Sequence, residues 1–195
     1  MRGFWLLIVS FLTTGSFGQK SQAQQGKKPG LALYESGFLK FADTHKIDAL
    51  KTALIDSFDI YDDANFKIAH IDAEELAEFS FETFMPALNS ILEKRNFKLS
   101  VKSAPDYQKS YKVSINGTVV QLYTEQDLKS SAFWETAPRN FFKEVNLQLH
   151  NAQLPETFYL LYGGNDLHVL LLTAPQQKII VQHYKGKPNE IPYLP

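Results

Sequence analysis

The pair Asn116-Gly117 is the feature of this sequence that most constrains its fold. The pair lies between two runs in which apolar and polar residues alternate. Asn-Gly favours a two-residue turn because both of its positions accept a positive φ, and such a turn fixes which residues pair across the hairpin. We therefore predict an antiparallel hairpin in which Val113 lies opposite Val120.

A second hairpin is predicted near the C-terminus. Gly164-Asn165 separates two further alternating runs, and a turn there pairs Leu160 with Val169. Both faces of these two strands carry apolar residues. This pattern is typical of strands in the centre of a sheet, or of strands that also cover a partner.

Apolar residues spaced by three and four predict helices in three segments, 44–58, 72–95 and 131–150. Asp72 precedes two glutamates and is expected to cap the second helix. Pro86 lacks an N–H and crowds the preceding turn, so we expect a kink or a restart there.

Together these segments predict an α+β fold with a mainly antiparallel sheet and helices packed on one face. The expected order is α-(β)-α-βββ-α-βββ, in which the bracketed element is a short strand near Ile68. The last strand is expected over residues 178–184, after a turn at 174–177.

The N-terminus has the pattern of a cleavable export signal. Arg2 is followed by an uncharged apolar run over residues 4–12, which is too short to cross a bilayer as a helix. Small residues follow at the spacing that a signal peptidase recognises. We expect residues 1–23 to form a signal peptide that is cut after Gly18 or after Ala23, and the mature protein to be periplasmic or secreted.

The rest of the chain is expected to form one domain. Residues 24–30 are mostly polar and predict a flexible tether, and residues 31–195 predict a single α+β domain. The chain has no cysteine, so an exported domain must be stable without disulfides.

We expect no membrane span in the mature chain. The net charge is −1 and the basic residues are dispersed among acids, so we expect no nucleic-acid partner.

The sequence contains no established catalytic or cofactor motif. It lacks the HExxH, GxSxG and GxxxxGK[ST] patterns, and we expect no cofactor.

One pair of candidate metal ligands follows from the predicted last hairpin. If residues 174–177 form a regular turn, His168 lies opposite His183. Two imidazoles are fewer than the three protein ligands that catalytic zinc usually has, so no metal is the preferred interpretation.

The function that best fits these observations is a non-catalytic exported binding module, with a protein as partner, in the manner of an inhibitor, an immunity factor or a chaperone. The candidate binding face is one side of the second hairpin, with Tyr159, Leu161, Leu170 and Leu172. One alternative is a carrier of a small apolar ligand held beneath the helices over 72–95 and 131–150. A second alternative is a metal- or carboxylate-dependent enzyme.

Overall fold

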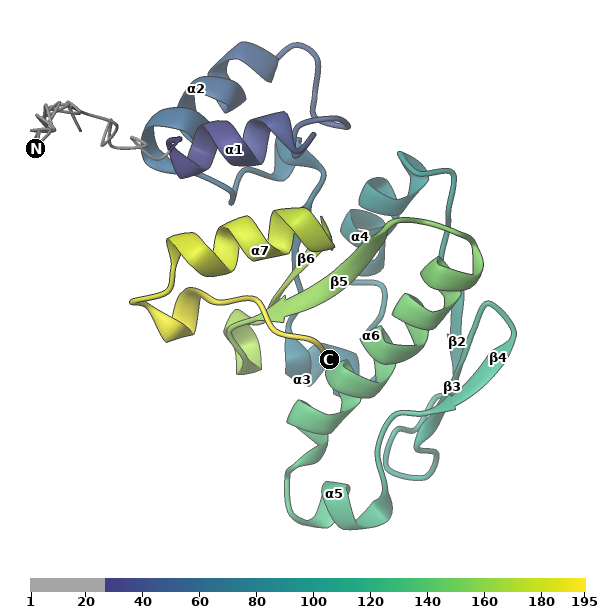
Figure 1. The fold of residues 1–195 in the computed structure, drawn as a ribbon. Helices are drawn as coiled ribbons and strands as arrows, with labels where there is room; N and C mark the ends of the chain where they lie inside the picture. The colour runs from purple at the N-terminus through teal and green to yellow at the C-terminus, as the bar shows by residue number, and fades with distance from the viewer. Residues whose placement is uncertain (1–26) are drawn as a thin grey trace, which may run out of the picture.

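Seven helices and two three-stranded antiparallel sheets make up residues 27–195, the part of the chain that this computed structural model describes (Figure 1). The α+β class is therefore confirmed. The helices are α1 (Pro29–Glu35), α2 (Ile47–Ser57), α3 (Ala73–Ala77), α4 (Met85–Glu93), α5 (Glu125–Lys129), α6 (Phe133–Asn151) and α7 (Ala174–His183). The strands are β1 (Ile68–His70), β2 (Val101–Ser103), β3 (Lys112–Ile115), β4 (Thr118–Gln121), β5 (Glu156–Leu161) and β6 (His168–Thr173). The predicted signal peptide, residues 1–23, lies outside the described residues.

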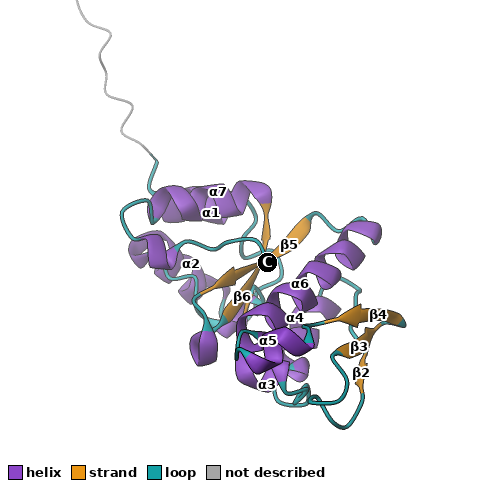
Figure 2. Cartoon of the chain, turned by 90° about the horizontal axis from the view of Figure 1, so that it is seen from below, coloured by secondary structure: helices purple, strands orange, loops and turns teal. Residues whose placement is uncertain are grey.

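The central sheet has the strand order β1-β6-β5, and its two faces are covered by different helices (Figures 1 and 2). Leu160 and Val169 are directly paired, as predicted, and they point into a core formed with α3, α4 and α6. Their neighbours Leu161 and Leu170 point to the opposite side, into a second core formed with α1, α2 and α7. Helices thus cover both faces of this sheet, rather than the single face expected from the sequence.

The second sheet, β2-β3-β4, contains the predicted Asn-Gly hairpin. Val113 pairs with Val120, which confirms the register. Asn116 and Gly117 both have a positive φ, of 49° and 89°. The Asn116 side chain also accepts a hydrogen bond from the Ser100 amide, at 2.7 Å, and so ties the turn to the residues before β2.

The segment after β6 is a helix and not the predicted strand. Residues 174–177 form the first turn of this helix and not a hairpin turn, and Pro175 lies where its missing N–H costs no helical hydrogen bond. The Gln176 side chain accepts a hydrogen bond from the Thr173 amide at 3.1 Å, which satisfies a free N–H at the start of α7. Gln176 and Ile180 are buried, four residues apart on one face of the helix.

The first helix begins at Pro29, inside the segment predicted as a tether. Gly30 is buried against α2, where a Cβ would overlap the Leu54 carbonyl oxygen. The ordered fold therefore includes at least two residues that the sequence pattern assigned to the tether. Sequence analysis missed this helix because it is short and shows no long apolar stripe.

The helical segment predicted over 72–95 is divided into α3 and α4. Asp72 caps α3 by accepting hydrogen bonds from the Glu74 and Glu75 amides, at 2.8 and 3.2 Å. Pro86 lies in the first turn of α4, so the predicted restart is confirmed. Among the helices of residues 27–195, none combines the length and apolar character that a membrane crossing needs.

Candidate functional site: a cation-lined pocket

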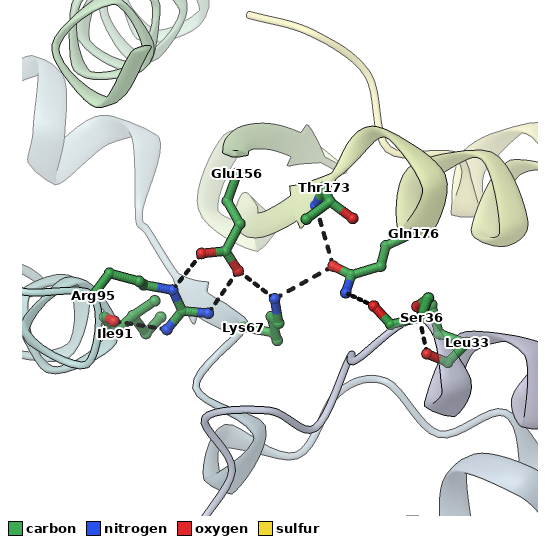
Figure 3. A network of polar contacts seen from close by, with 8 residues as sticks. All are labelled: Leu33, Ser36, Lys67, Ile91, Arg95, Glu156, Thr173 and Gln176. Carbon is green, nitrogen blue, oxygen red and sulfur yellow. Dashed lines mark hydrogen bonds and ion pairs between the residues drawn. The ribbon is translucent and has the colours of Figure 1, made fainter. Parts of the chain in front are cut away.

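A pocket of about 490 Å³ lies where four helix and strand ends meet. Its walls come from the residues that follow α1 and α4, from the start of β5 and from the start of α7. Figure 3 shows the network of polar contacts in its wall. The volume is in the range of small-molecule binding sites.

Arg95 and Glu156 form the centre of the pocket wall. Arg95 Nε donates to Glu156 Oε2 at 2.8 Å, and Nη2 donates to Oε1 at 2.9 Å. A third donor, Nη1, binds the Ile91 carbonyl at 2.8 Å and holds the guanidinium against α4. Both side chains are 6% exposed or less, so this bidentate ion pair is almost completely shielded from water.

Lys67 adds a second cation to the same carboxylate. Its ammonium group donates to Glu156 Oε1 at 2.5 Å and to Gln176 Oε1 at 3.3 Å. The Gln176 amide nitrogen in turn donates to the Ser36 carbonyl at 3.2 Å. The network therefore connects the end of α1, the residue before β1, the start of β5 and the first turn of α7 (Figure 3).

The electrostatics of this cluster follow from its burial. Burial lowers the pKa of Lys67 to about 8, and the neighbouring Glu156 carboxylate opposes only part of that effect. Burial also acts to raise the pKa of Glu156, but the hydrogen bonds and charges of Arg95 and Lys67 outweigh it and lower that pKa overall. At neutral pH the cluster thus holds two cations and one anion.

Two exposed lysines add to the positive charge at the edge of the pocket. Lys40 and Lys94 line it together with the buried cations, whereas Glu156 is the only carboxylate among its lining residues. The Phe41 ring lies 4.2 Å from the Arg95 guanidinium and covers its face. The pocket thus combines four cationic side chains, one carboxylate and an aromatic wall.

This arrangement favours an anion in the pocket. A buried cation in excess of its counter-charge is costly, and an incoming carboxylate or phosphate would neutralise it. Donors also remain for such a group. An ammonium group has three N–H bonds and a guanidinium has five. Within residues 27–195, Lys67 donates two hydrogen bonds and Arg95 donates three, so each side chain keeps N–H groups for a ligand.

The binding face predicted from the sequence is not exposed. Leu161, Leu170 and Leu172 are fully buried in the core beneath α1, α2 and α7, and Tyr159 is half-buried at the edge of that core. The apolar residues on both sides of these strands are explained by helices on both sides. That the chain binds a protein partner stays a prediction.

The predicted pairing of His168 with His183 is wrong, because the segment that contains His183 is helical. His183 instead stacks on the Phe58 ring, with ring centres 3.8 Å apart. The residues directly opposite His168 are His70 on β1 and Leu161 on β5. Sequence analysis missed the pairing with His70 because β1 joins the sheet from a distant part of the chain.

The space between the helical segments 72–95 and 131–150, where an apolar ligand was considered, contains packed aromatic rings. Phe141 of α6 lies 5.9 Å from Phe81 and 6.4 Å from Phe84, measured between ring centres. These rings form part of the larger core. We therefore assign no ligand to that space.

The pocket residues carried a weak signal in the sequence. Lys67 lies between Phe66 and Ile68, a charged residue among strand-forming apolar ones. Glu156 similarly precedes an apolar strand. Arg95 follows the apolar residues Ile91 and Leu92 at the end of a helical segment, where a basic residue is common and gives no sign of a distant partner. Opposite charges within apolar segments are the observation that would have pointed to a buried ionic cluster.

Comparisons with protein-family models, with curated proteins and with solved structures find no match.

Proposed function

We propose that this chain is an exported, non-catalytic binding protein that holds a small anionic ligand in the pocket beside Lys67 and Arg95. The ligand is expected to carry a carboxylate or phosphate group. The observation that carries the proposal is the excess of cations in a half-enclosed pocket, on a chain whose overall net charge is −1.

The contacts of the ionic cluster support binding rather than catalysis. Both Glu156 oxygens accept hydrogen bonds from cationic donors, and Lys67 is held by Glu156 and Gln176. A rigid wall of this kind is already organised before a ligand arrives, so binding costs little conformational entropy. The Phe41 ring offers an apolar surface for the rest of the ligand.

Calorimetric titration of the purified protein with inorganic phosphate and with citrate tests the proposal. We expect saturable binding of at least one probe in a 1:1 ratio. Lys94→Ala and Lys40→Ala remove exposed charges at the pocket edge, and each should weaken binding about three- to tenfold because one attractive charge is lost. Each change also removes a contact with a partly exposed ring, since Lys94 lies over Phe66 and Lys40 over Phe41.

Lys112→Ala is the matched control, since Lys112 is an exposed lysine on β3 that does not line the pocket. It should leave the affinity unchanged. Equal weakening by all three variants would mean that the anions respond to net charge alone, and failure of both probes to bind would count against a pocket for small anions.

We also propose that the chain is exported, on the support of the charge and apolar pattern of residues 1–23. N-terminal sequencing of the protein recovered from the periplasm of a bacterial host is expected to begin at Gln19 or Gln24. Recovery of an intact N-terminus in the membrane fraction would contradict a cleaved signal.

A further inference from the structure

Two histidines face each other at one end of the central sheet. His70 on β1 and His168 on β6 are direct cross-strand partners, and their ring centres are 5.0 Å apart. His70 is exposed and His168 is partly exposed, so solvent reaches the pair. The pair lies on the sheet face that is otherwise covered by α1, α2 and α7.

A single turn orients both rings. His70 Nε2 donates to the Asn165 carbonyl at 2.7 Å, and His168 Nδ1 donates to the Asp166 carbonyl at 2.8 Å. A neutral imidazole has one N–H, so the lone pairs remain on Nδ1 of His70 and on Nε2 of His168. Metal-binding histidines are commonly held in this way, with the other ring nitrogen bound to a carbonyl.

The spacing of the rings also fits a shared ion. With a Zn–N distance of about 2.0–2.1 Å, two imidazoles on one tetrahedral ion have ring centres about 5 Å apart. We propose that Nδ1 of His70 and Nε2 of His168 bind one divalent transition-metal ion of the Zn²⁺ class. Within residues 27–195, no third His, Cys, Asp or Glu joins the pair, so water completes the coordination and the ion exchanges readily.

Calorimetric titration of Zn²⁺ into protein purified without a histidine tag tests the site. We expect one ion per chain. His70→Ala and His168→Ala should each weaken binding at least tenfold, because a single imidazole does not chelate. The loss in the double variant should be smaller than the sum of the two single losses in binding free energy, since both residues serve the same ion. His150→Ala, at the exposed end of α6, is the matched control and should bind as the unchanged protein does.

A second measurement does not depend on the folding of the variants. Nitrogen NMR of the unchanged protein should show Zn²⁺ shifting the signals of His70 Nδ1 and His168 Nε2 and leaving His150 unaffected. Absence of 1:1 binding, an unchanged affinity in both single variants, or shifts confined to other histidines would overturn the proposal.

Discussion

Arg95 binds both carboxylate oxygens of Glu156, with Nε 2.8 Å from Oε2 and Nη2 2.9 Å from Oε1. The pair joins the end of α4 to the first residue of β5. Because Lys67 binds the same carboxylate, Glu156 is the only negative charge for two buried cations in this network. Removing Glu156 and removing Lys67 should therefore change the free energy of unfolding by very different amounts.

Glu156→Gln should lower the free energy of unfolding by about 3–5 kcal/mol, because it leaves two buried cations without their counter-charge. Lys67→Met should change it by less than about 1 kcal/mol, since the Arg95–Glu156 pair remains and an uncompensated charge is removed. Urea unfolding followed by circular dichroism measures both. Equal losses in the two variants would contradict the charge balance described for the pocket.

Stability should depend on pH through Lys67. Burial lowers the pKa of Lys67 from 10.5 to about 8, so between these values the unfolded chain binds more protons than the native one. The contribution of Lys67 to the free energy of unfolding therefore increases as the pH rises above 8. The increase is on the order of 2 kcal/mol by pH 10. Below pH 8 the contribution is constant.

The Lys67→Met variant isolates this effect, because all other titrating groups remain in it. Urea unfolding at pH 7.5, 8.5 and 9.5 should show that the unchanged protein gains stability relative to the variant as pH rises. A difference between the two proteins that does not vary with pH would mean that the pKa of Lys67 is not lowered.

Gly30→Ala should lower the free energy of unfolding by about 2–3 kcal/mol, because the added Cβ would overlap the Leu54 carbonyl and force α1 away from α2. Gly163→Ala is the matched control. A Cβ there meets no atom within 4 Å and the backbone is extended, so the change should stay within about 0.5 kcal/mol. If Gly30→Ala left the free energy of unfolding unchanged, Gly30 would not pack against α2, and the prediction of a flexible tether over these residues would stand.

The local parts of this fold could be predicted from the sequence, and the long-range parts could not. The Asn116-Gly117 hairpin was correct because a two-residue turn fixes its own register. Leu160 does pair with Val169, but residues 162–167 connect the two strands through a 3-10 turn at Gly164–Asp166, in place of the predicted two-residue turn. The helix α7 was predicted as a strand because the few apolar residues in this short segment fit both the helical repeat of 3.6 residues and the strand repeat of two.

The candidate site could not be predicted for a related reason. Lys67, Arg95 and Glu156 are far apart in the sequence, and only the packing of β1, α4 and β5 brings their charges together. The same holds for His70 and His168. Pairing across distant segments depends on which strand joins the sheet, and local patterns carry no information about that choice.

The most direct test of the anion pocket is a map of backbone amide NMR shifts during titration with citrate. We predict saturable shifts at the walls of the pocket, residues 36–41, 94–96 and 154–156, and unchanged signals in β2, β3 and β4. The shifts should be reduced in Lys94→Ala at the same citrate concentration. Shifts confined to other surfaces, or no shifts at millimolar citrate, would contradict the assignment of this pocket as the binding site.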